Sequence, residues 1–282
     1  MAIRSKSIRN EFYAPRRPED EPIWEVFHAK SKLLPHRKWQ LGERIARLQA
    51  EGLVKEMAGA YKSYPNKPQI ELPTAKLGTG ASIQELITRR RSRRAFDTNQ
   101  ALTAQTIGNI LQLSYGITGV LGESGGVTQY ARAVPSAGAL YPLELYVMIQ
   151  RVDGVAPGIY HYRVAHHALE ALSIGDQAPL FARTEPDWGM SATAAANLVI
   201  TAVFERSTVK YGERGYRFAL MEAGMLGQNA SLVAAYEGID TCMMGGFLDD
   251  EFNAVLGLDG ISESVLLPIC LGKSSSIRAR DE

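Results

Sequence analysis

An α+β fold is the class that the sequence predicts, and three observations predict it. Apolar runs typical of buried strands, such as residues 143–150 and 197–205, are separated by amphipathic segments typical of helices. These strand-like and helix-like segments do not alternate regularly, as they would in a βαβ protein. The 282 residues are 45% hydrophobic and 22% charged, which is the composition of a globular protein with a substantial core.

Charge and cysteine content exclude several classes of protein. Lys and Arg total 31 against 30 Asp and Glu, so the net charge of +1 provides no chain-wide field to recruit nucleic acid or an anionic membrane. Cys242 and Cys270 lack CxxC spacing, which excludes a disulfide framework and a zinc ribbon. No apolar segment follows the basic residues at the N-terminus as in a signal peptide, and no apolar run reaches the roughly 18 residues of a membrane span. We therefore expect a cytoplasmic protein without a metal site.

The first 75 residues differ in character from the rest of the chain. Residues 1–22 are polar and carry three prolines, so we expect a loose arm. Apolar residues in 23–60 recur at spacings that predict two short amphipathic helices. The stretch 64–80 contains three prolines and two glycines, which predicts an extended linker. We divide the chain into an N-terminal arm and helical extension with its linker, 1–75, and a main domain, 76–282.

Capping residues and apolar runs predict the elements of the main domain in order. Ser82 and Glu85 form a capping-box pattern at the start of one helix, and Thr103 is a cap for the next. The glycine-rich residues 116–126 indicate a mobile loop. Predicted strands lie at 143–150, 158–164, 167–174, 197–205, 241–244 and 264–272, and further helices lie at 216–237 and 249–256. The longer of these helices is apolar around much of its circumference, as expected of a helix that is buried on several sides or shared with a partner subunit.

Five arginines lie within six positions, from Arg89 to Arg94, around Ser92. A solvated charge run is the usual explanation of such a stretch. In a chain of net charge +1 it is a local concentration, however, and guanidinium groups beside a hydroxyl match a phosphate monoester. We interpret it as a site for a phosphorylated cofactor rather than for nucleic acid, because no long basic face with interleaved aromatics accompanies it.

Two segments of small residues would allow a flat ring to approach the backbone. Residues 135–138 lead into a predicted strand, and the glycines at 245–246 follow another. An ordinary turn would explain either segment alone.

Lys210 and Tyr211 form a candidate acid–base pair. A partly desolvated lysine falls in pKa, and a phenol can donate or relay a proton. The alternative is a lysine and a tyrosine that only cover apolar surface. Neighbours on a regular helix point about 100° apart, so both reach one substrate only at a helix end or an irregularity, which Gly212 and Gly215 allow.

Two other patterns are weaker. The residues around Ser124 match a nucleophile elbow, but they lie in the predicted loop without a strand before them or a helix after them. His161, His166 and His167 lie in a predicted hairpin without carboxylates at metal spacing, so we expect surface histidines.

Taken together and in this order, the segments resemble the nitroreductase superfamily of flavoproteins, and within it the SagB-type dehydrogenases, which oxidise thiazolines and oxazolines to thiazoles and oxazoles. The resemblance covers about residues 82–273. It implies a central mixed β-sheet flanked by helices, an intertwined homodimer, and FMN as the cofactor.

The resemblance also assigns residues. The element that holds the FMN phosphate corresponds to Arg90, Arg91, Ser92 and Arg94, with Lys273 returning to the phosphate. The loop that covers the flavin, usually from the other subunit, corresponds to Pro135, Ser136, Ala137 and Gly138, and the glycines beside the flavin's reactive edge correspond to Gly245 and Gly246. The Lys–Tyr pair of azoline dehydrogenases matches Lys210 and Tyr211. Where many relatives have histidine after Glu-Ala-Gly, this chain has Met225.

The activity that the resemblance implies is FMN-dependent oxidation of azoline rings in peptide natural-product biosynthesis, with Lys210 as general base and Tyr211 as proton relay or hydrogen-bond donor. The implied partners are a second copy of the chain, an azoline-containing peptide or carrier-bound substrate, and a cyclodehydratase or synthetase. Two alternatives stay open: an NAD(P)H-dependent nitro or quinone reductase of the same fold, and a flavin-binding structural subunit of a cyclase complex.

Overall fold

The computed structural model describes residues 23–53, 61–78, 80–124, 127–186 and 189–274, so the arm expected at 1–22 lies outside the described residues. The helices are α2 (Ile23–Lys30), α3 (Lys38–Ala50), α5 (Ile83–Arg89), α6 (Ala104–Tyr115), α7 (Ala178–Ala182), α8 (Met190–Thr193), α9 (Glu205–Tyr211), α10 (Glu213–Tyr236) and α11 (Asp249–Leu256), with 3-10 turns η1 (Pro35–Arg37), η2 (Ala137–Ala139) and η3 (Val164–His166). The strands are β1 (Gln69–Glu71), β2 (Leu102–Thr103), β3 (Ile117–Ser124), β4 (Val127–Arg132), β5 (Leu143–Ile149), β6 (Val152–Asp153), β7 (Gly158–Arg163), β8 (Ala168–Ile174), β9 (Ala196–Val203), β10 (Asp240–Met243) and β11 (Glu263–Gly272). Within the described ranges, every helix lacks the length or the apolarity that a membrane crossing requires.

Seven strands form the central sheet, in the order β1-β8-β7-β5-β9-β11-β10. The α+β class is therefore confirmed. The expected mixed sheet is wrong in one respect, because each neighbouring pair in this sheet is antiparallel. A parallel pairing occurs in the small β2–β6 sheet instead.

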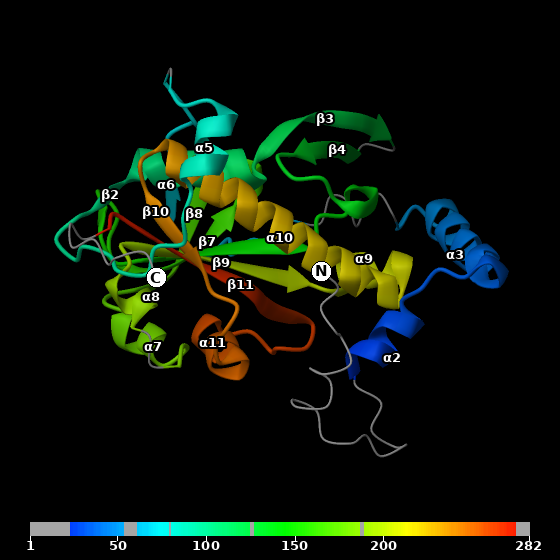
Figure 1. The fold of residues 1–282 in the computed structure, drawn as a ribbon. Helices are drawn as coiled ribbons and strands as arrows, with labels where there is room; N and C mark the ends of the chain where they lie inside the picture. The colour runs from blue at the N-terminus through cyan, green and yellow to red at the C-terminus, as the bar shows by residue number, and fades with distance from the viewer. Residues whose placement is uncertain (1–22, 54–60, 79, 125–126, 187–188, 275–282) are drawn as a thin grey trace, which may run out of the picture.

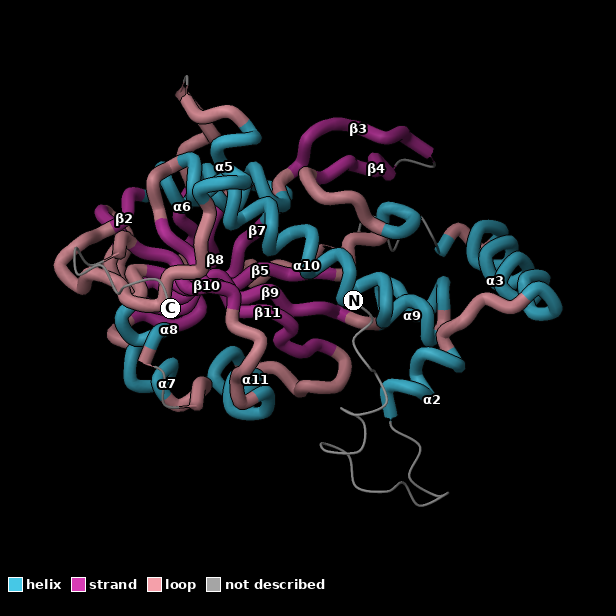
Figure 2. The backbone as a smooth tube through the Cα atoms, viewed as in Figure 1, coloured by secondary structure: helices cyan, strands magenta, loops and turns pink. Residues whose placement is uncertain are grey.

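Helices cover both faces of the sheet, and the alternation along β5 shows how. Leu143, Leu145 and Val147 belong to one apolar core, which α6 and α10 also line. Tyr146 and Met148 point to the opposite face and belong to a second core, which residues of α7, α8 and α11 line. Figure 1 and Figure 2 show the same arrangement, with the strands between the two groups of helices. Because both faces are covered, the whole of β5 is buried, as its continuous apolar run predicts.

Part of the predicted linker belongs to the central sheet. Its residues 69–71 form the edge strand β1, which pairs with β8 from Gln69 opposite Glu170 to Glu71 opposite Ala168. Just before it, Lys62 donates to the Tyr146 hydroxyl at 2.6 Å and to Glu263 at 2.5 Å. The stretch is extended, as expected, but it is held by the sheet. The division of the chain after residue 75 stays a prediction.

The predicted mobile loop at 116–126 is wrong, because residues 117–124 form β3 and pair with β4 in a separate hairpin. Ser124 is therefore preceded by a strand, contrary to expectation. The next described element is β4 rather than a helix, so the context of a nucleophile elbow is still missing.

The expectation of surface histidines is wrong for His161, which is fully buried. Its Nδ1 lies 2.8 Å from a Glu170 oxygen and its Nε2 lies 2.9 Å from a Glu144 oxygen. Arg206 completes the cluster with an ion pair to Glu144 at 2.5 Å. Among the described residues, no group of three His, Cys, Asp or Glu side chains has an arrangement that could hold a metal ion. The cluster therefore ties α9, which carries Arg206, to strands β5, β7 and β8.

Candidate active site

Lys210 and Tyr211 lie at the end of α9, as the sequence requires if both are to face one substrate. The helix stops because Gly212 adopts φ 59° and ψ −145°, a conformation that is open to glycine and costly for other residues. The chain then turns directly into α10 at Glu213. The last two side chains of α9 are thus free of the constraint that a continuous helix would impose.

The loop at 135–138 contacts this pair in the same chain. Gly138 has φ 64°, and a Cβ atom at this residue would lie 2.5 Å from the Tyr211 hydroxyl and 2.7 Å from Lys210 Nζ. The Lys210 Nζ is 5.3 Å from the centroid of the Tyr211 ring. Only a glycine leaves room for the pair to approach the loop backbone so closely.

Burial affects Lys210 and Tyr211 in opposite directions. Lys210 is 8% exposed, and desolvation lowers the pKa of its ammonium group. Desolvation also raises the pKa of the Tyr211 phenol. Within the described part of the chain, no carboxylate forms an ion pair with Lys210. Burial therefore makes the Lys210 ammonium group easier to deprotonate and the Tyr211 phenol harder to deprotonate.

The underside of the loop contacts ionisable groups that the sequence analysis did not single out. The Ser136 hydroxyl accepts a hydrogen bond from the Tyr141 backbone N–H at 2.9 Å and interacts with the buried Glu222 of α10. The Tyr115 hydroxyl donates to Glu222 at 3.4 Å. Arg132 lies over the ring of Tyr141, 4.6 Å from its centroid. The signal that could have revealed Glu222 is a carboxylate in a helix that is otherwise apolar on its buried side.

The arginine segment is built onto β10 and onto the residues after β11. Ser92 pairs with Thr241, and the Arg93 backbone N–H donates to the Thr241 carbonyl at 2.9 Å. The Asp97 N–H donates to the carbonyl of Lys273 at 2.8 Å. These bonds bring together the phosphate-binding residues that the resemblance implies.

Two cavities adjoin this segment. Arg90 and Arg91 line one of about 130 Å³ together with residues 238–241. Arg94 and Gly245 line another of about 290 Å³ together with methionine side chains from α8 and β10. Arg91 also caps α5, because its Nη1 donates to the carbonyls of Thr88 and Arg90, both at 2.8 Å.

The chemistry of these residues fits a flavin mononucleotide. Guanidinium groups and the Ser92 hydroxyl match a phosphate, and the methionine-lined cavity beside Gly245 matches a flat, largely apolar ring. Gly246 follows at the same strand end.

Arg90 and Arg91 and the Lys–Tyr pair lie at opposite ends of α10. Lys210 and Tyr211 directly precede α10, whereas Arg90 and Arg91 adjoin residues 238–241, just beyond its other end. A helix of 24 residues is about 36 Å long. Figure 1 shows α9 and α5 at the two ends of α10. A single chain therefore contains both groups of residues of the implied site but holds them apart.

Met225 lies on the solvent-facing side of α10. It is 38% exposed, and Leu220 and Met221 on the same helix are 41% and 57% exposed. The residue that stands where many relatives have histidine therefore belongs to an exposed, mainly apolar stripe, which we call the α10 stripe.

Comparison with known proteins decides the family. The model of the nitroreductase family matches residues 87–273, which include every implied FMN-binding residue and the Lys–Tyr pair. The chain belongs to the nitroreductase family. This nitroreductase-family protein is 33% identical over 208 residues to a protein of Methanocaldococcus jannaschii that is also named as a nitroreductase, across 73% of this chain and 96% of the relative.

A second relative supports the resemblance to the SagB-type branch. The microcin B17-processing protein McbC of Escherichia coli is 33% identical over 133 residues, which cover 45% of this chain and 49% of McbC. The solved structure of the E. coli microcin synthetase McbBCD complex with truncated pro-MccB17 bound contains a chain that aligns at a TM-score of 0.57 and 25% identity, over 90% of this nitroreductase-family chain and 92% of that one.

Proposed function

We propose that this protein is an FMN-dependent dehydrogenase that oxidises thiazoline or oxazoline rings in a peptide natural product. The observation that carries the proposal is the Lys210–Tyr211 pair, which lies against the loop at 135–138, with Lys210 buried and the pKa of its ammonium group lowered by desolvation. A reductase that only passes electrons has no need of such a base. The relationship to a microcin B17-processing protein supports a peptide substrate and a partner that forms the azoline ring.

The reaction removes a hydride from one ring carbon and a proton from its neighbour, so that a new double bond makes the ring aromatic. FMN, when bound by Arg90, Ser92, Arg94 and Lys273, supplies the acceptor for the hydride. Lys210 Nζ accepts the proton. Tyr211, which stays protonated, donates a hydrogen bond that orients the ring, and the Gly138 backbone closes the site against water.

The site is completed by a second copy of the chain. α10 separates Arg90 and Arg91 from the Lys–Tyr pair of the same chain by its own length of about 36 Å, so a second copy that packs along α10 would bring its Lys–Tyr pair to the flavin held by the first. The exposed α10 stripe supports this contact, since a helix face with three large, exposed apolar residues favours burial.

Anaerobic spectroscopy tests the function. Addition of a thiazoline-containing peptide to the FMN-loaded protein should bleach the visible flavin absorption, and the peptide should lose two hydrogen atoms by mass. Lys210→Gln should slow the bleaching about 100-fold at unchanged flavin content, because the base is lost. Glu205→Gln, a change of an exposed side chain on the same helix, serves as the control and should bleach at the wild-type rate.

Other outcomes would support the alternatives. Bleaching by NADPH but not by the azoline would make the protein a reductase. Flavin binding without bleaching by either compound would make it a structural subunit. Undiminished bleaching in Lys210→Gln would remove the lysine from the mechanism.

A further inference from the structure

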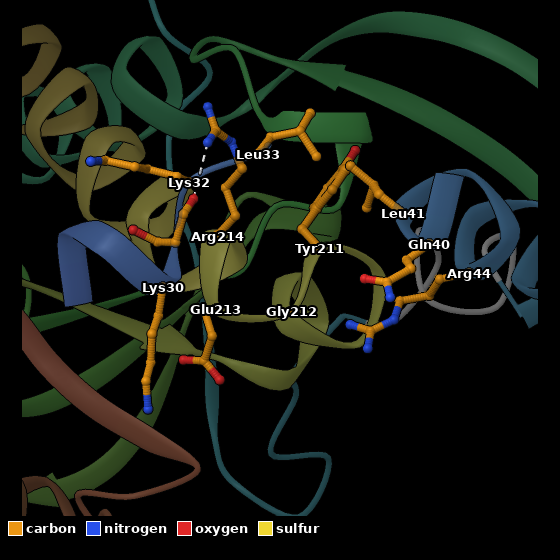
Figure 3. Close-up of a pocket in the computed structure, with 11 residues that line it drawn as sticks. Lys30, Lys32, Leu33, Gln40, Leu41, Arg44, Tyr211, Gly212, Glu213 and Arg214 are labelled. Atoms are coloured by element: carbon orange, nitrogen blue, oxygen red, sulfur yellow. Dashed lines mark hydrogen bonds between the residues drawn. The ribbon is translucent and has the colours of Figure 1, made fainter. Parts of the chain in front are cut away.

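A cavity of about 320 Å³ lies between the N-terminal helices and the junction of α9 with α10. Figure 3 shows it with α2 and α3 contributing walls and Tyr211 between them. The cavity is separate from those beside the arginine segment, and Tyr211 is the residue of the proposed active site that lines it. At this volume it admits a few side chains rather than a whole cofactor.

The α2 wall is fastened to the domain by specific contacts. Arg214 Nη1 donates to the Ser31 carbonyl at 3.0 Å, and the Arg217 guanidinium donates to the Ser31 hydroxyl. The ring of Phe27 packs edge-on against Tyr216 with a centroid distance of 5.5 Å. The cavity therefore lies between the domain and an N-terminal extension that is packed against it.

The lining of this cavity is cationic. Lys30, Lys32, Arg44 and Arg214 contribute four positive groups against the single carboxylate of Glu213, an excess of three charges in a chain whose net charge is +1. Arg214 is engaged with α2, but among the described residues no carboxylate pairs with Lys30, Lys32 or Arg44. Such a local excess attracts an anion.

Arg44 is the cation that faces the reacting residues. Its Nη1 lies 3.0 Å from the point where a Cβ on Gly212 would be, directly after Tyr211. In Figure 3, Arg44 and Gln40 extend from α3 toward Gly212, whereas Lys30 and Lys32 extend from α2 away from Tyr211. Arg44 is thus positioned for a direct contact, and the lysines add charge at the outer edge.

Tyr211 connects the cavity to the candidate active site. Its ring lines the cavity, and its hydroxyl faces Gly138 and the loop at 135–138. If a substrate enters through the cavity and its reacting ring reaches Tyr211, the residues next to that ring lie in the cavity.

We propose that the N-terminal extension forms a subsite for a carboxylate-bearing segment of the peptide substrate, with Arg44 as its principal contact. Peptides that carry Asp or Glu next to the reacting ring then bind more tightly than neutral ones. The identity of the ring rests on the proposed function, whereas the preference for a carboxylate rests on the cavity alone.

Binding of a product peptide tests the subsite without turnover. The probes are two labelled thiazole peptides that differ only in flanking residues, Glu-Glu against Gln-Gln, and fluorescence anisotropy with the FMN-loaded protein gives their Kd values. The acidic peptide should bind about tenfold more tightly at low salt, and high salt should reduce the difference. Arg44→Gln combined with Lys30→Gln should abolish the preference. Lys38→Gln removes the same type of charge from α3 outside the cavity and should retain it.

Equal Kd values for the two peptides in the wild type would overturn the subsite, as would an equal loss of preference in Lys38→Gln. Competition by free phosphopantetheine that exceeds competition by the acidic peptide would also overturn it, because the occupant would then be a carrier's phosphate. If the acidic preference is found but the corresponding thiazoline peptide is not oxidised, the subsite stands and the proposed function fails. If oxidation occurs without the preference, only the subsite fails.

Discussion

Glu222 is a carboxylic acid in an almost completely buried position, 1% exposed on α10. One of its oxygens accepts from Tyr115, and within the described residues the other has no hydrogen-bond partner. Desolvation raises the pKa of Glu222 to about 7, although the nearby Arg132 and the bond to Ser136 oppose the shift. The group therefore changes its charge within the range of pH that a cell experiences.

This pKa makes stability depend on pH. Below the pKa of the unfolded chain both states are protonated. As pH rises toward 7, the unfolded chain ionises while the folded protein keeps its proton, so stability falls by up to about 3 kcal/mol. Glu222→Gln should remove this part of the fall, and urea denaturation between pH 5 and pH 8 measures it. Glu123→Gln, an exposed carboxylate, should keep the wild-type slope, and an unchanged slope in Glu222→Gln would contradict the assignment.

The position of an individual residue was predictable where a nearby glycine determines the backbone conformation. Placement of Lys210 and Tyr211 at a helix end follows from Gly212, and that placement is confirmed. Burial of His161 was not predictable, because its two carboxylate partners are 9 and 17 residues away and meet it only once β5, β7 and β8 pair.

Elements were predictable where local signals agree with the fold. The Ser82–Glu85 capping box and the Thr103 cap are both formed, and the helix at Asp249–Leu256 has the predicted bounds. β3 was missed because its glycines hide the alternation of a strand, although Gly125-Gly126 between two apolar runs is a hairpin signal. β1 was missed because a run of three residues carries too little pattern to predict a strand, and these residues form one only by pairing with β8.

The backbone directly after the loop at 135–138 is strained, close to where Gly138 contacts the Lys–Tyr pair. Ala139 and Tyr141 have φ of 52° and 46°, which is uncommon for residues other than glycine. Such a conformation persists only where surrounding bonds hold it, and the bond from the Tyr141 N–H to the Ser136 hydroxyl is one of them.

Gly138→Ala should therefore affect the chemistry more than the fold. A Cβ would collide with the Tyr211 hydroxyl and Lys210 Nζ, so the pair must move, and kcat should fall about 100-fold. The positive φ should cost about 1 kcal/mol of stability. Gly119→Ala has open space around the new methyl group and is the matched control. Wild-type kcat in Gly138→Ala would show that the pair tolerates displacement.

At the scale of the whole molecule, Arg90 and Arg91 lie beyond the opposite end of α10 from the Lys–Tyr pair of the same chain. The length of α10 was predictable from its apolar pattern, but the position of the arginine segment beyond its far end was not, because it depends on the pairing of Ser92 with Thr241. A composite site predicts complementation between two inactive variants.

Mixing Arg94→Ala chains with Lys210→Ala chains should restore activity. In a mixed dimer, one site receives the intact arginine segment from one chain and the intact lysine from the other, while the second site lacks both. Activity after mixing and reassociation should approach half of the wild-type value per mixed dimer, and light scattering should show two chains per particle. No recovery in verified mixed dimers would place the whole site within one chain.

The edge strand β1 limits how this protein can be shortened. A chain that begins at residue 76 would lack β1, and the backbone N–H and C=O groups of β8 that β1 engages would face solvent. Bare strand edges recruit other strands, so copies would join through β8. Such a fragment would also lose Lys62 and leave the buried Glu263 without its cation. Aggregation of the isolated family-like domain would then reflect a missing strand rather than a missing cofactor.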